Sequence, residues 1–155
     1  MRDLRKSLKE EKIQSLRLHT PFCVEAGTPI GNVLKEMAGR RIGHAIVIKE
    51  KKVIGIFTER DALTRMVEQK IGSGTPVDSL MTPDPKVLKK DDSVAEAIRL
   101  MSQGGYRHLP ILNEREEIAG IVSVRDILQY LADHFPYEVY NLPPDPQIIR
   151  APEGA

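Results

Sequence analysis

The sequence predicts an α/β (α+β) fold made of two similar units, each ordered helix, strand, strand, helix after a short extended lead-in. Three observations predict it: apolar residues recur twice at helical spacing, two apolar β-branched segments follow each time, and both units end in Gly-x-x-Thr/Ser-x-x-Asp. A unit of this size cannot bury both of its faces alone. We therefore expect the two units to pack together.

Residues 1–12 are charge-dense and predict a short surface helix at the N-terminus. The next helix is expected to begin with Thr28 as its cap and Pro29 in its first turn, because proline is tolerated there. Its apolar residues are spaced to lie on one face, and it should end near Gly39. This part of the chain therefore begins with an amphipathic helix.

Two apolar strands are predicted at 45–48 and 53–57, joined by a polar turn as a hairpin. A helix is expected after Thr58. Residues 71–76, Ile-Gly-Ser-Gly-Thr-Pro, have the composition of a linker.

The same order of elements then repeats. The helix face that starts at Val94 matches the one at Ile30 with an offset of 64 (94 minus 30), and the strand at 109–112 keeps that offset. The second strand, around Gly120, is offset by 65 because one residue is inserted in the turn. The predicted organisation is an N-terminal helical extension (1–12), a first repeat (13–70), a linker (71–76), a second repeat (77–135) and a tail rich in proline and aromatic residues (136–155).

Composition narrows the possible functions. The chain has 155 residues, 41% of them hydrophobic and 29% charged, as in ordinary globular proteins, and its net charge of +1 argues against nucleic acid as a partner. No apolar run is long enough to span a membrane, and the N-terminus lacks the core of a signal peptide. The single cysteine, Cys23, cannot form an internal disulfide. We expect a cytoplasmic protein without a membrane partner.

The repeated motif places a hydroxyl group and a carboxylate at a strand-to-helix junction: Thr58 with Asp61, and Ser123 with Asp126. Backbone N–H groups at a helix N-terminus favour phosphate, and a carboxylate one turn later can accept two hydrogen bonds from a ribose diol. The alternative is that both pairs are only capping boxes. The repetition, with an arginine before each aspartate, favours a nucleotide.

These residues, with Thr28-Pro29, Ser93-Val94 and the strand start Arg107-His108-Leu109-Pro110, resemble a tandem pair of cystathionine-β-synthase (CBS) domains, called a Bateman module. The resemblance implies two β-α-β-β-α repeats related by pseudo-twofold symmetry, with clefts between them. It also implies ligands such as AMP, ADP, ATP or S-adenosylmethionine, with no cofactor required.

The ligand-binding residues implied by the resemblance, together with nearby polar candidates, are Thr58, Asp61, Ser123, Asp126, Arg107, His108, Arg125 and Thr82. For Arg107 and His108 the alternative is an exposed arginine and a structural histidine; for Arg125 it is a solvent-exposed side chain. The family's Met-Thr pair stands at Met81-Thr82, and our alignment places Arg17-Leu18 at the equivalent positions of the first repeat. Since the second repeat keeps more of the family pattern, we expect Asp126 to matter more than Asp61.

The predicted function is a stand-alone regulatory sensor that binds an adenosine nucleotide and signals occupancy to an unknown protein partner. The alternative is a structural or oligomerisation module with empty clefts. The four histidines and one cysteine are not spaced like a metal site or a catalytic set, so we expect neither an enzyme nor a metal protein.

Two expectations concern assembly. Tandem repeats of this family form flat discs, which implies a homodimer, and the candidate interface residues are Met37, Met66, Met101 and Leu131. Met37 and Met101 have core packing as their alternative. The aromatic segment 135–144 is expected to be ordered and to dock on the chain or on a partner.

Overall fold

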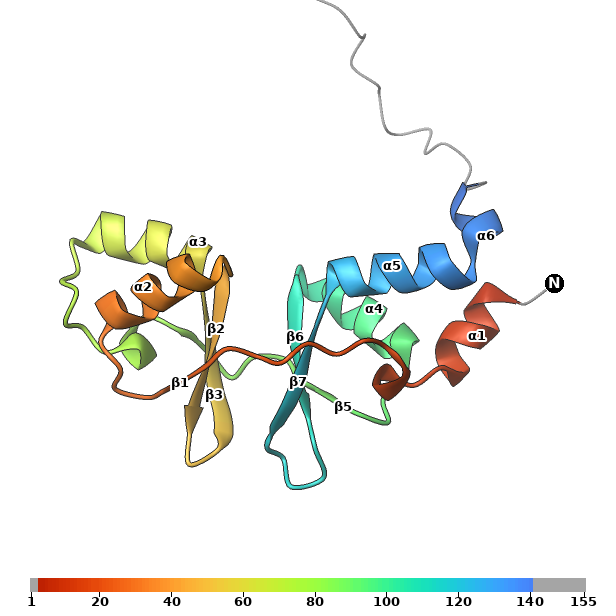
Figure 1. The fold of residues 1–155 in the computed structure, drawn as a ribbon, viewed down its shortest axis with the longest axis horizontal. Helices are drawn as coiled ribbons and strands as arrows, with labels where there is room; N and C mark the ends of the chain where they lie inside the picture. The colour runs from red at the N-terminus through yellow and green to blue at the C-terminus, as the bar shows by residue number, and fades with distance from the viewer. Residues whose placement is uncertain (1–2, 141–155) are drawn as a thin grey trace, which may run out of the picture.

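The computed structural model describes residues 3–140, and its two halves confirm the predicted α/β fold (Figure 1). The parts of the predicted extension and tail at 1–2 and 141–155 lie outside the described residues. The chain begins with helix α1 (Leu4–Glu10) and a short 3-10 turn, η1 (Ile13–Ser15).

Each half contains a hairpin covered by helices on one face. The elements of the first half are β1 (Cys23–Glu25), α2 (Ile30–Arg40), β2 (His44–Lys49), β3 (Lys52–Thr58), α3 (Glu59–Asp61) and the π-helical segment η2 (Ala62–Val67). Those after the linker are η3 (Val77–Ser79), β4 (Thr82–Pro83), β5 (Leu88–Lys89), α4 (Val94–Gly104), β6 (His108–Leu112), β7 (Ile118–Ser123), α5 (Val124–His134) and α6 (Pro136–Tyr140).

The two sheets have the orders β1-β2-β3-β4 and β5-β6-β7. In each sheet the first strand runs parallel to the second, and the remaining pairs are antiparallel. The hairpins β2-β3 and β6-β7 face each other (Figure 1), and they meet where Lys52 forms a bridge to Glu117 and donates to the carbonyl oxygen of Arg115. The two hairpins therefore form the junction between the halves.

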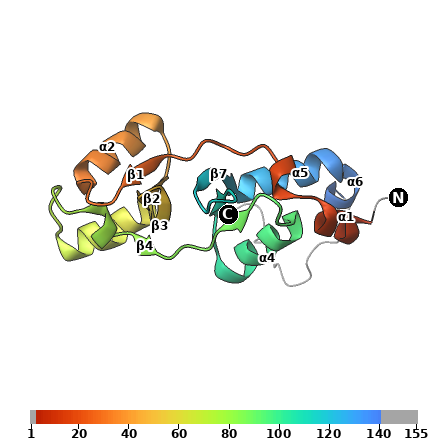
Figure 2. The same cartoon turned by 90° about the horizontal axis from the view of Figure 1, so that it is seen from below.

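The chain crosses between the halves twice, so each half includes a segment from the other end of the sequence (Figures 1 and 2). Ile13 and Leu16 are buried in the core that contains α4 and α5, while Val77 and Leu80 are buried in the core beneath α2. Between these points run the two lead-in segments, 17–22 and 80–83. Because each core contains apolar residues from a segment that crosses from the other half, neither half is an independent unit.

The predicted first helix has a different start. Pro29 is the N-cap residue of α2 and contributes no side-chain hydrogen bond, whereas the hydroxyl of Thr28 donates to the carbonyl oxygen of Glu25. The expectation that Thr28 caps this helix was wrong because its hydroxyl is used in the preceding turn. The end is as expected within one residue, with Arg41 in the left-handed conformation at φ 55°.

Methionines at matched helical positions belong to the two cores. Met37 is 3% exposed and Met101 8% exposed, so the core alternative is confirmed for both and they cannot form an outer interface. The exposed large apolar residues on the helices are instead Leu63, Val67 and Leu128. At the end of α5, Phe135 is 2% exposed and packs in the second core, so the start of the predicted aromatic segment docks on its own chain.

Candidate functional site

A cleft of about 1130 Å³ lies between the halves, large enough for a nucleotide-sized ligand. It is walled by the first lead-in segment, by the end of α2, by the starts of β2 and β6, and by the junction of β7 with α5. Its polar and charged lining consists of His19, Thr20, Arg40, His44, Arg107, His108, Ser123, Arg125 and Asp126. The cleft thus brings together five of the eight predicted site residues: Arg107, His108, Ser123, Arg125 and Asp126.

The junction at Ser123 and Asp126 is a complete capping box. Asp126 Oδ2 accepts hydrogen bonds from the Ser123 backbone N–H at 2.7 Å and from its hydroxyl at 2.9 Å, and Ser123 Oγ accepts from the Asp126 N–H at 3.2 Å. The structure therefore confirms the capping geometry. It leaves the second carboxylate oxygen for other partners.

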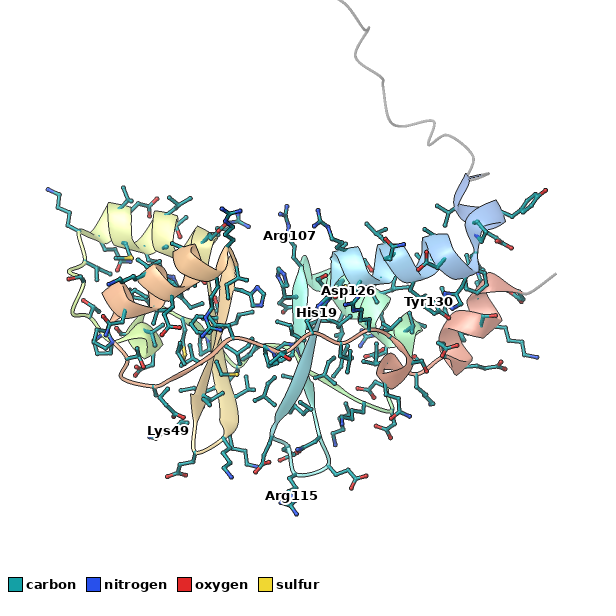
Figure 3. The ribbon with its side chains drawn as sticks, viewed as in Figure 1. His19, Lys49, Arg107, Arg115, Asp126 and Tyr130 are labelled. Atoms are coloured by element: carbon teal, nitrogen blue, oxygen red, sulfur yellow. The ribbon has the colours of Figure 1, made fainter. Side chains whose placement is uncertain are left out.

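That second oxygen contacts a histidine from the other end of the chain. His19 Nε2 lies 2.6 Å from Asp126 Oδ1, and Figure 3 shows the two side chains meeting where the lead-in segment passes β7. The Asp126 side chain is 14% exposed and that of His19 is 52% exposed. Burial raises the pKa of Asp126, but hydrogen bonds from the backbone and hydroxyl of Ser123 and from His19 outweigh it, so the net pKa lies below the usual value. Asp126 is ionised at neutral pH.

Two histidines meet at the junction of the halves. The His44 and His108 rings lie 4.3 Å apart between centroids and are tilted by 31°. Burial, followed by the charge of His108, lowers the pKa of His44 to about 4. Burial also lowers the pKa of His108, and Arg107 acts in the same direction, while Asp126 opposes them. Both rings are therefore neutral at pH 7 and can act as hydrogen-bonding groups toward the cleft.

Three arginines give the cleft its positive charge. Arg40 is held by an ion pair to Glu36 at 3.1 Å and stacks 4.6 Å above the Phe22 ring. Arg107 and Arg125 are exposed, and within residues 3–140 neither forms an ion pair with a carboxylate. Two guanidinium groups at the cleft can therefore bind an incoming anion.

The first-half junction has the same capping box but does not line the large cleft. Asp61 Oδ2 accepts from the Thr58 N–H at 3.0 Å and from its hydroxyl at 3.1 Å, and Oδ1 lies 3.8 Å from Arg65 Nε. The same arginine donates to the carbonyl oxygens of Leu80 and Met81, each at 2.8 Å. Among the described residues, the lining of the large cleft includes neither Thr58 nor Asp61.

Strand register corrects our alignment of the lead-in segments. Thr82 lies opposite Ile56 in β4-β3, and His19 lies opposite Ile121, so His19 is the equivalent of Thr82 at an offset of 63 (82 minus 19). Thr82 belongs to the Asp61 side of the molecule and is not part of the Asp126 cleft lining in the described chain. We expected Asp126 to matter more than Asp61 partly because the second repeat keeps the Met-Thr pair. That argument was wrong, because Thr82 lies on the Asp61 side.

Sequence reasoning missed His19, Arg40 and His44 as cleft residues. The signal that could have found His19 is its equivalence to Thr82, one residue away from our alignment of the lead-in segments. This equivalence is visible only once the strands are paired. Within residues 3–140 no group of three or more His, Cys, Asp or Glu side chains could hold a metal ion, and no helix is long and apolar enough to cross a membrane.

Comparison with known proteins agrees with this architecture. The CBS domain family profile matches residues 13–68 and 77–133. An uncharacterized 17.7 kDa protein of Acidianus ambivalens is 34% identical over 123 residues, which are 79% of this chain and 74% of that protein. The chain spans only 22% of the length of a matched CBS domain-containing protein of Arabidopsis thaliana.

Solved structures share the fold. A CBS domain protein from Pyrobaculum aerophilum, complexed with AMP, superposes with a TM-score of 0.69 at 27% identity, covering 79% of this chain and 98% of that one. A CBS domain pair in complex with 5′-methylthioadenosine and S-adenosyl-L-methionine superposes with a TM-score of 0.69 at 20% identity, covering 79% and 96%. Structural relatives thus bind adenosine compounds, and two matched repeats over most of its length show that this chain belongs to the CBS domain family as a tandem pair.

Proposed function

We propose that the cleft beside Asp126 binds an adenosine nucleotide, and that occupancy is passed to a protein partner through a change in conformation. One observation carries the proposal: an ionised carboxylate, fixed through Oδ2 by its capping box and in contact with the half-exposed His19 through Oδ1, lines a nucleotide-sized cleft together with two guanidinium groups that form no ion pair within residues 3–140. A fixed anion suits a diol, and free cations suit phosphate.

Each part of the ligand has a matching surface. The ribose hydroxyls would donate to Asp126 Oδ1, and the phosphates would lie toward Arg107 and Arg125. Ile42 and Ile121, which also line the cleft, offer apolar contact to the adenine ring. The AMP complex of the Pyrobaculum aerophilum relative supports this choice of ligand class.

The test is a thermal melting panel with AMP, ADP, ATP, S-adenosylmethionine and 2′,3′-dideoxy-AMP. A ligand at a hundred times its dissociation constant adds roughly 2.7 kcal/mol, so a ribonucleotide should raise the melting temperature by about 5 °C or more, and the dideoxy analogue by less. Absence of a shift with all ribonucleotides would refute the proposal.

The phosphate contact has a matched control. Arg107 immediately precedes β6 and Arg115 lies in the turn between β6 and β7, so the two residues are at opposite ends of the same hairpin (Figure 3). Arg107→Gln should weaken AMP binding about tenfold, while Arg115→Gln should leave it unchanged. Equal effects would place the phosphate elsewhere.

The complete capping boxes favour a second candidate, a structural module with empty clefts. Both Asp61 and Asp126 already satisfy orphan helix N–H groups, which a purely structural role would explain. Mass spectrometry of small molecules retained by the native protein separates the two candidates, since only the first predicts a bound adenosine compound.

We also propose a homodimer whose interface includes Leu63, Val67 and Leu128. These side chains are 68%, 71% and 59% exposed on the helices of the two halves. Burial of these apolar side chains against a second copy would stabilise the dimer. A monomeric mass by light scattering at micromolar concentration would contradict this arrangement.

A further inference from the structure

His19 already occupies the carboxylate oxygen that the proposed ligand needs. Asp126 Oδ2 accepts two hydrogen bonds from Ser123, and Oδ1 is 2.6 Å from His19 Nε2. A ribose diol that approaches Asp126 through the cleft must therefore meet the imidazole first.

We propose that His19 is an intramolecular competitor for Asp126, and that the ribose diol of a nucleotide displaces it. The inference rests on the proposed function, because it concerns how the same cleft opens. His19 is then neither a ligand contact nor a purely structural residue: it holds the carboxylate in the free protein and releases it on binding.

The exposure of His19 makes displacement possible. The His19 side chain is half exposed, and a polar contact with one solvated partner contributes little net stability. In the first half, by contrast, Arg65 contacts Asp61 and two backbone carbonyls at once, so a ligand would have to break three contacts there. Of these two motif carboxylates, Asp126 therefore has the contact that a nucleotide can replace more easily.

The position of His19 connects the cleft to both halves of the molecule. Its backbone pairs with Ile121 in both directions, with N–O distances of 3.3 and 3.1 Å. Leu16 precedes it in the second core, and Phe22 follows it in the first. A change at His19 therefore acts on the segment that joins the two halves, which is where a sensor would transmit occupancy.

Calorimetric titration with AMP and 2′,3′-dideoxy-AMP tests the competition in three proteins: wild type, His19→Ala and His19→Gln. Removing a half-exposed competitor should tighten AMP binding by about two- to fivefold in His19→Ala. His19→Gln retains a donor of similar reach and should stay near wild type. Dideoxy-AMP, which has no diol to compete with, should bind His19→Ala and wild type equally.

The sign of the effect decides the matter. Weaker or unchanged AMP binding by His19→Ala would overturn the proposal, because a ligand contact or a bystander gives those results. If wild type binds none of the ribonucleotides, the proposed function fails first; if wild type binds AMP but His19→Ala gains nothing, only the competition fails.

A second measurement observes the imidazole directly. The His19 ring resonances, assigned by their loss in His19→Gln, should move toward those of a free histidine when AMP is added, and should not move with dideoxy-AMP. Unchanged His19 resonances at saturating AMP would overturn displacement even if the affinities agreed with it.

Discussion

The two halves have the same capping box at the same place, yet they treat the remaining carboxylate oxygen in different ways. Asp61 Oδ1 faces Arg65, one turn along its own helix, whereas Asp126 Oδ1 contacts His19, 107 residues away in the sequence. A neighbour on the same helix keeps its place relative to the carboxylate, while a residue from a crossing segment can move with that segment. Identical motifs can therefore serve structure in one half and binding in the other.

The helices after the motifs differ accordingly. The second half continues as a regular α-helix, α5, while the first half widens after Asp61 into a π-helical segment that contains Arg65. Such segments change which side chains face a neighbour. Here Arg65 reaches the carbonyl oxygens of Leu80 and Met81 in the second lead-in. The first-half junction is closed by its own side chain.

The largest difference between the halves should appear on replacing each aspartate by asparagine. At this N3 position asparagine keeps one oxygen to accept the N–H of the N-cap residue, but it lacks the negative charge and the second acceptor oxygen. Asp126→Asn should remove most of the roughly 2.7 kcal/mol that saturating AMP adds, and Asp61→Asn should keep it. Thermal melting with and without AMP measures both. Loss of the shift in Asp61→Asn alone would reverse our assignment of the two halves.

The closure of the first half predicts the next effect. Arg65→Met keeps the apolar stem but removes two charge-assisted hydrogen bonds, and should cost about 2 kcal/mol in the free energy of unfolding. Arg60→Met, at an exposed neighbouring position, should change it by less than about 0.5 kcal/mol. Urea denaturation compares them.

Stoichiometry sharpens the same test. Wild type should bind one AMP per chain, because of the two motif carboxylates Asp126 has the weaker contact for a ligand to displace. If calorimetry gives two AMP per chain for wild type, Arg65 does not close the first half.

The sequence was sufficient to predict both repeats, their hairpins and the motif at each junction, since all of these follow from local periodicity and turn chemistry. It was insufficient for the cleft. His19 and Thr82 are equivalent only through their pairing with Ile121 and Ile56, and an alignment by constant offset missed this by one residue. Long-range pairing decides which lead-in meets which aspartate, and no local pattern encodes it.

The motif glycines offer a third comparison, because each faces a different lead-in residue. A Cβ on Gly55 would lie 2.1 Å from Met81 Sδ, whereas one on Gly120 would lie 3.2 Å from Leu18 Cβ. Gly55→Ala must therefore move the Met81 side chain and should cost about 1.5 kcal/mol, and Gly120→Ala less than about 1 kcal/mol. Urea midpoints rank the two, and equal costs would show that the second lead-in adapts more readily than this packing implies.

The smallest expected difference lies in the acid response of the paired histidines. His44, with its pKa lowered to about 4 by burial and then by His108, stays neutral in the folded protein after an unfolded histidine, with its ordinary value of 6.5, has taken up a proton. The unfolded state therefore binds more protons between these values, and stability is lost as the pH falls from about 6.5 toward 4. Solvent screening limits the contribution of this half-buried ring to about 1 kcal/mol.

The pKa of His108 is also lowered by burial, but Asp126 partly restores it, so its contribution should be smaller. Urea denaturation at pH 7.5 and pH 5 should therefore show that His44→Gln flattens the pH dependence more than His108→Gln, and equal flattening would mean that Asp126 does not distinguish the two rings.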